Sequence, residues 1–126
     1  MDDHLGTAEL TLLRTGRPNL LITGRPDRTA ALLATLAPAL PQPVYEWAPA
    51  GALPRRRGVG TILIRDVARL SAGEQLAWLN WLDGADQPRI VSTSTFPLFP
   101  LVEQGAFLAA LYYRLNTVLL DVAEAG

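Results

Sequence analysis

The sequence contains no cysteine and no lysine, and it has a single histidine, His4. Without cysteine the chain can form neither a disulfide bond nor a thiolate metal site, which fits a reducing compartment. It has no run of about 18 apolar residues, so the sequence predicts no membrane-spanning helix. The acidic N-terminus lacks the positive segment that begins a secretory signal, and we therefore expect a cytoplasmic protein.

The charge balance is close to neutral. All eleven cationic residues are arginine, and the twelve acidic residues bring the net charge to −1. This balance provides no general attraction to nucleic acid or to anionic lipid. Apolar residues make up 49% of the 126 positions, which is enough to build the core of a single domain over residues 1–126.

Short apolar runs alternate with helical patterns along the chain. Helical spacing is found at residues 7–16, 28–37, 71–84 and 106–115, whereas residues 51–60 have the composition of a loop and two prolines interrupt residues 96–105. The apolar runs predict strands at Leu20–Thr23, Val44–Trp47, Thr61–Arg65, Arg89–Thr93 and Val118–Val122. This alternation predicts a three-layer α/β domain with a mostly parallel five-stranded sheet.

The helix predicted over residues 71–84 carries two further signals. Ser71 and Glu74 form the sequence pattern of a capping box, which marks a helix start. Trp78 and Trp81 lie three residues apart beside leucines, so we expect them to pack in the core. An exposed tryptophan would instead mark an interface.

Ligands of parallel α/β sheets bind beyond the carboxyl ends of the strands. We therefore expect any chemistry in the loops at residues 24–28, 65–66 and 93–94. The first of these, in the stretch "LLITGRPDRTAALLATL", has the strand, turn and helix order of a phosphate-binding loop.

Three motifs give the chain a family resemblance. "EQGAFLAALYYRLNTVLLDV" is similar to a G-x-F-R-x-D-L-Y-Y-R-L-N-V stretch, "GTILIRDVARLSAGEQLAWLNWL" to a G-T-L-F-L-D-E-I segment with its following helix, and "RIVSTS" to R-V-I-A-A-T-N. In this order they resemble the AAA+ domain of sigma-54-dependent transcriptional activators, over about residues 7–122. The resemblance implies a P-loop NTPase α/β subdomain with the strand order 5-1-4-3-2.

The phosphate loop departs from the family pattern G-E-x-G-T-G-K-E. The aligned residues are Gly24, Arg25, Pro26, Asp27, Arg28, Thr29, Ala30 and Ala31. Ala30 stands where the resemblance implies the lysine that grips the phosphates, and Asp27 adds negative charge there. Two interpretations stay open, an ordinary turn whose Asp27 caps the helix and a weak phosphate site served by Arg25 and Arg28.

The other two loops also depart from the family. Arg65-Asp66 replaces the Asp-Glu pair that the resemblance implies for magnesium and for the attacking water. We predict that Arg65 pairs with Asp27 or Asp66, because a half-buried charge needs a partner. Thr93-Ser94 stands where the resemblance implies a Thr-Asn pair that senses the γ-phosphate. The alternative is that these two hydroxyls simply satisfy backbone groups at the strand end.

Two arginine features relate to partners. Of two family arginines that reach a neighbouring subunit's ATP site, Leu108 replaces the first and Arg114 matches the second. If docking survives, we expect Arg114 to be exposed, with Leu108, Leu111 and Tyr112 in an apolar rim. Two interpretations of the cluster Arg55-Arg56-Arg57 stay open. It is a solvated loop, or it attracts a phosphate group or an acidic partner.

Several family elements are not found in the sequence. Only "APAGALPRRRGVG" connects the second and third strands, where the family has its sigma-contacting insertion, and the sequence carries no helical lid or DNA-reading helix-turn-helix. The resemblance and its departures suggest a non-catalytic regulatory or protein-interaction module with no cofactor and no direct contact with DNA or membrane. Its partner would be an AAA+ transcriptional activator or a second copy. The alternative is a nucleotide or phosphate sensor that binds ATP and magnesium without hydrolysis.

Overall fold

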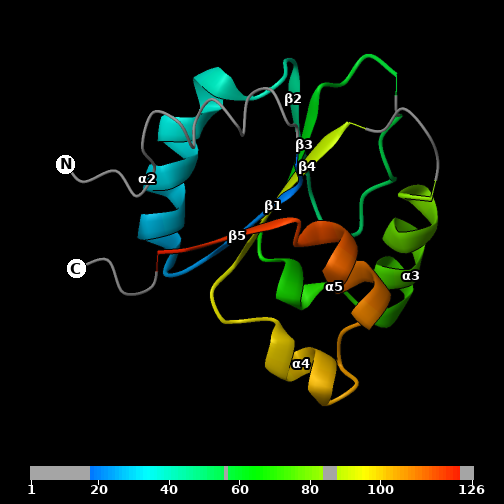
Figure 1. Cartoon of the computed structure of the whole chain (residues 1–126). Coiled ribbons are helices and arrows are strands. Elements are labelled where there is room, and N and C mark those ends of the chain that lie inside the picture. Colours follow the sequence, from blue (N-terminus) through cyan, green and yellow to red (C-terminus); the bar gives the residue numbers. More distant parts are fainter. Residues whose placement is uncertain (1–17, 56, 84–87, 123–126) are drawn as a thin grey trace.

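The computed structural model describes residues 18–55, 57–83 and 88–122 (Figure 1). Its strands are β1 (Leu20–Thr23), β2 (Val44–Trp47), β3 (Thr61–Ile64), β4 (Arg89–Ser94) and β5 (Val118–Asp121). They form one parallel sheet in the order β2-β3-β4-β1-β5. The predicted strands and strand order are confirmed, although β3, β4 and β5 each end one residue away from the predicted position.

Among the described residues, helices lie in every connection between strands except the one from β2 to β3. They are α2 (Pro26–Leu36), the 3-10 turns η1 (Ala37–Ala39) and η2 (Val67–Arg69), α3 (Ala72–Trp81), α4 (Phe99–Glu103) and α5 (Ala109–Leu115). No described helix has the length and hydrophobicity needed to cross a bilayer. His4 and the helix predicted over residues 7–16 lie outside the described residues.

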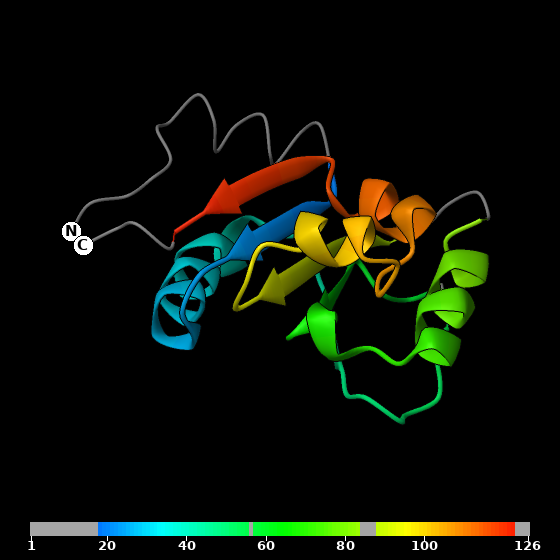
Figure 2. The ribbon, with the colours of Figure 1, turned by 90° about the horizontal axis from the view of Figure 1, so that it is seen from below.

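The sheet lies between helices, with α2 on one side and α3 and α5 on the other, as Figure 2 shows from below. On one face α2 packs on the sheet, through Leu20, Ile22, Leu32, Leu33, Leu36, Leu40, Leu63, Val91 and Val122. On the other face α3 and α5 contribute to a larger cluster, with Leu21, Trp47, Ile62, Ile64, Val67, Leu70, Trp78, Leu82, Ile90, Leu98, Phe107, Leu111, Tyr112 and Leu115. Both faces of the sheet are therefore covered, as the alternating pattern predicted.

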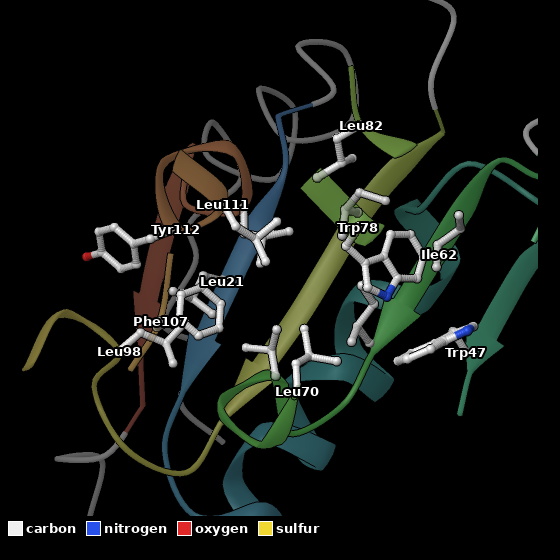
Figure 3. Packing of buried hydrophobic residues seen from close by; sticks show 14 residues of the cluster. Leu21, Trp47, Ile62, Leu70, Trp78, Leu82, Leu98, Phe107, Leu111 and Tyr112 are labelled. Carbon is white, nitrogen blue, oxygen red and sulfur yellow. The ribbon is translucent and has the colours of Figure 1, made fainter. Parts of the chain in front are cut away.

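Trp47 and Trp78 lie side by side at the β2 end of the larger cluster (Figure 3). Trp78 is fully buried and meets Trp47 edge-on, with ring centroids 5.3 Å apart. Trp81 meets Trp78 at 5.2 Å and is partly buried. The expected core packing is thus confirmed for Trp78, while Trp81 lies at the rim of the same cluster.

The capping box of α3 is confirmed. The Ser71 Oγ accepts a hydrogen bond from the Glu74 N–H, and the Glu74 Oε1 accepts one from the Ser71 N–H. These reciprocal bonds satisfy two backbone donors that a helix start otherwise leaves open.

The segment from 96 to 105 differs from expectation. Its prolines predicted an irregular stretch, yet Phe99–Glu103 forms the short helix α4. Pro100 lies in the first turn, where a backbone N–H has no helical acceptor, so the missing donor costs nothing.

Candidate functional site at the carboxyl edge of the sheet

The three predicted loops meet at the carboxyl edge of β1, β3 and β4. The Gly24 N–H donates to the Ser94 carbonyl at 3.0 Å, which joins the turn after β1 to the end of β4. The Asp66 N–H donates to the Thr93 Oγ1 at 2.9 Å, which joins the turn after β3 to the same strand. The structure therefore places the aligned nucleotide-site positions side by side.

The turn from β1 into α2 depends on a glycine. Gly24 is buried and has φ of 151°, a conformation that side-chain-bearing residues rarely adopt. Arg25 is the N-cap of α2 and makes no side-chain cap, while Thr29 is buried and its Oγ1 donates to the Pro26 carbonyl. The prediction that Asp27 caps the helix is wrong, because the N-cap is Arg25 and the helix already begins at Pro26, two residues before the start that an Asp27 cap would give.

Asp27 instead pairs with Arg25. The Arg25 Nη2 lies 3.0 Å from the Asp27 Oδ2, and the Arg25 Nε lies 3.2 Å from Oδ1. This hydrogen bonding lowers the pKa of the Asp27 carboxyl and raises the pKa of the Arg25 guanidinium. The two charges neutralise each other at the mouth of the turn, where Ala30 is exposed and Arg28 is half-buried.

Arg65 turns away from the other two loops. Its Nε lies 2.7 Å from the Glu46 Oε2 on the edge strand β2, and both side chains are about half exposed. Within the described residues Arg65 forms no ion pair with Asp27 or Asp66, so that prediction is wrong. Arg65 pairs with Glu46 because of the register in which β3 pairs with β2.

Glu46 is the register partner of Leu63. Residues two apart on a strand share one face, so Arg65 follows Leu63 on the side where Glu46 projects. Asp27, in contrast, follows β1, and β4 separates that strand from β3. Nothing in the sequence pattern singled out Glu46, because its pairing with Arg65 depends on the register of β2 with β3.

Asp66 adopts a left-handed backbone conformation, with φ of 58°. The Arg69 Nη1 approaches its carboxylate at 3.8 Å, the outer range of an ion pair. Within the parts of the chain that the structure describes, no three histidine, aspartate or glutamate side chains are grouped as a metal site. Because magnesium prefers carboxylate and water oxygens, an arginine beside a single aspartate does not fit that ion.

The hydroxyls at the end of β4 satisfy backbone groups. Thr93 accepts the Asp66 N–H, and the Ser94 Oγ donates to the Phe96 carbonyl at 2.5 Å and accepts from the Phe96 N–H at 3.3 Å. The backbone-satisfying interpretation of Thr93 and Ser94 is therefore confirmed.

Arg114 is occupied inside the fold. Its guanidinium donates to the Leu82 carbonyl at the C-terminal end of α3, where the helix dipole favours a cation. Its own carbonyl accepts from the Asn19 Nδ2 at 2.9 Å.

The expectation that Arg114 is exposed and free is wrong. Leu111 and Tyr112 are buried rather than in an apolar rim, whereas Leu108 is partly exposed. The C-terminal end of α3, where backbone carbonyls carry partial negative charge, supplies the partner of the guanidinium.

This arrangement defines a class of protein. A five-stranded parallel sheet in this order, with helices on both faces and a glycine turn after β1, is the α/β fold of P-loop NTPases. The family model described as "Sigma-54 interaction domain" matches residues 7–124. The chain belongs to this family, as the sequence motifs predicted.

Solved structures agree on the fold. The P-loop NTPase domain of a sigma-54 activator from E. coli superposes with a TM-score of 0.68 at 18% identity, covering 94% of this chain and 92% of that one. NtrX from Brucella abortus in complex with ATP gives 0.67 at 20% identity and covers 90% of this chain. A DNA polymerase III gamma subunit-related protein from Thermotoga maritima superposes with a TM-score of 0.57 at 14% sequence identity.

This chain covers different shares of these relatives' lengths. The matched region is only 33% of the NtrX chain, so this chain spans about a third of that relative. No curated protein matches the sequence.

Proposed function

We propose that this chain is a non-catalytic regulatory or protein-interaction module of the sigma-54 interaction domain family. The observation that carries the proposal is the direction of Arg65. A cation stands where the resemblance implies a metal-side carboxylate, and it forms its ion pair outward, with Glu46.

Phosphoryl transfer needs positive charge at the β- and γ-phosphates and a metal ion that bridges them. Ala30 supplies no charge at the lysine position, and Asp27 is already neutralised by Arg25. Asp66 keeps an acid at the water-activating position, but a carboxylate there cannot replace the missing electrostatic support. These features favour a module that works by binding another protein.

The family membership supports a role in sigma-54-dependent transcription control. The partner would be an AAA+ transcriptional activator or a second copy of this chain, with no direct contact to DNA or membrane. The test is a co-purification and mixed ATPase assay with a sigma-54 activator from the same organism. We expect stable association or a changed activator rate, whereas no association together with an unchanged rate would contradict the regulatory role.

A second candidate is a nucleotide or phosphate sensor without hydrolysis. Arg28 favours it, because it is half-buried beside the glycine turn and, in the described residues, forms no ion pair. Arg25 and Arg65 would assist after leaving their present partners. Calorimetric titration with ATP, with and without magnesium, distinguishes the candidates. A micromolar isotherm that weakens in Arg28→Gln would favour the sensor.

A further inference from the structure

The connection at residues 48–60, between β2 and β3, is held by two indole groups, one at the end of β2 and one on α3. The Trp47 Nε1 donates to the Ala52 carbonyl at 3.1 Å, and the Trp81 Nε1 donates to the Pro54 carbonyl at 2.9 Å. Figure 1 shows this connection passing beside α3. A loop whose backbone carbonyls bond to rigid aromatic side chains has fewer conformations than a solvated loop.

A carboxylate adds a third contact. The Ala50 N–H donates to the Glu74 Oε2 at 2.9 Å, so the acid of the capping box also ties the start of the connection. Leu53 and Val59 pack against the larger core cluster. Hydrogen bonds and apolar contacts thus secure the connection on both sides of its arginine segment.

The connection presents unpaired positive charge. Arg55 and Arg57 are exposed, and within the described residues neither forms an ion pair with a carboxylate. The other described exposed arginines, Arg25, Arg65 and Arg69, each have an acidic partner.

We propose that Arg55 and Arg57 form a docking surface for an acidic segment of a protein partner. This inference rests on the proposed function, because it supplies the partner chemistry of a module that works by binding. Guanidinium groups bond carboxylates with two parallel hydrogen bonds. Since the tryptophans and Glu74 already order the backbone, binding loses little further conformational entropy.

Nucleic acid is the poorer fit for this surface. The sequence-independent affinity of a protein for duplex DNA grows with the number of phosphate groups that it contacts. Proteins that rely on such contacts commonly make roughly six to ten of them. The described part of this surface offers two arginines on a chain of net charge −1. A short acidic peptide requires only a few charged contacts.

The chain contains its own reporter for the test. All three of its tryptophans, Trp47, Trp78 and Trp81, lie in the cluster beneath this connection, so their fluorescence responds to occupancy of the loop. The full chain is titrated at low ionic strength with a peptide of ten glutamates and, separately, with a duplex oligonucleotide of equal charge. We expect saturable peptide binding that is tighter than oligonucleotide binding.

Variants locate the surface. Arg55→Gln with Arg57→Gln should weaken peptide binding by roughly tenfold or more, because it removes two charge-assisted hydrogen-bonding groups and the loss of one such group already costs about tenfold. Arg69→Gln removes an exposed arginine elsewhere and should leave the affinity within about twofold. Trp81→Phe keeps an aromatic ring but loses the indole N–H that bonds to Pro54, and should weaken binding several-fold while unfolding stays cooperative.

Three results would overturn the proposal: no saturable peptide binding, tighter binding of the oligonucleotide, or an equal loss of affinity in the Arg69→Gln control and the Arg55→Gln with Arg57→Gln variant. The titration contains no nucleotide. Its failure would therefore leave the proposed loss of hydrolysis standing, and hydrolysis by the chain would leave this docking surface standing.

Discussion

The guanidinium of Arg65 lies 2.7 Å from the carboxylate of Glu46, across the pairing of β3 with the edge strand β2. This contact turns a cation out of the edge where the three loops meet. It also explains how an arginine is accommodated at a position where the resemblance implies a metal-binding acid. The carboxylate of Glu46 on the neighbouring strand balances the charge of the arginine.

A double-mutant cycle measures that pair. Both side chains are about half exposed, so solvent screens their attraction. We expect Arg65→Gln and Glu46→Gln to show a coupling energy below about 1 kcal/mol in chemical denaturation, decreasing with added salt. A coupling above about 3 kcal/mol, insensitive to salt, would indicate a buried pair instead.

Glu74 gives the stability a defined pH dependence. Backbone N–H groups of Ser71 and Ala50 hold the pKa of its carboxyl below the ordinary value of 4.5. A lowered folded pKa contributes stability that is present above pH 4.5 and is lost as the pH falls through the folded value. As the pH falls from neutral to below 4.5, the free energy of unfolding should therefore decrease less in Glu74→Gln than in the natural chain. Urea unfolding at each pH measures this difference. Equal pH slopes would contradict this assignment.

Gly60 leaves no room for a side chain. A Cβ at this position would lie 2.6 Å from the backbone of Pro41 and Gln42. We expect Gly60→Ala to lower the free energy of unfolding by about 1–3 kcal/mol, because the backbone beside β2 must shift. Gly73→Ala is the matched control, since a Cβ there meets nothing within 4 Å in the first turn of α3. It should be neutral or stabilising by up to about 1 kcal/mol.

Arg114 should matter for folding rather than for docking. Arg114→Met keeps the aliphatic stem but leaves the Leu82 carbonyl without its charged donor. We expect a loss of about 1–2 kcal/mol in thermal or urea unfolding, given the helix-end position. Arg69→Met, at an exposed arginine, serves as the control and should change stability by less than about 0.5 kcal/mol. Equal losses in both variants would remove the capping role of Arg114.

The sheet could be predicted from sequence because each strand is a short apolar run bounded by turn residues, and the family motifs supplied the strand order. Ser71 and Glu74 could be predicted because a capping box is local. The partners of Arg65 and Arg114 could not, since they depend on strand register and on the distance between α3 and α5. The helix α4 was missed because proline breaks a helix interior but is tolerated in the first turn.

The most direct test of the central claim is magnesium-dependent phosphate release from ATP by the purified chain, compared with a buffer blank and with Asp66→Asn. We expect no release above the blank for either protein, because Ala30 and Arg65 stand where hydrolysis needs a lysine charge and a metal ligand. Release that requires magnesium and disappears in Asp66→Asn would contradict it, and would place a working catalytic acid at the end of β3.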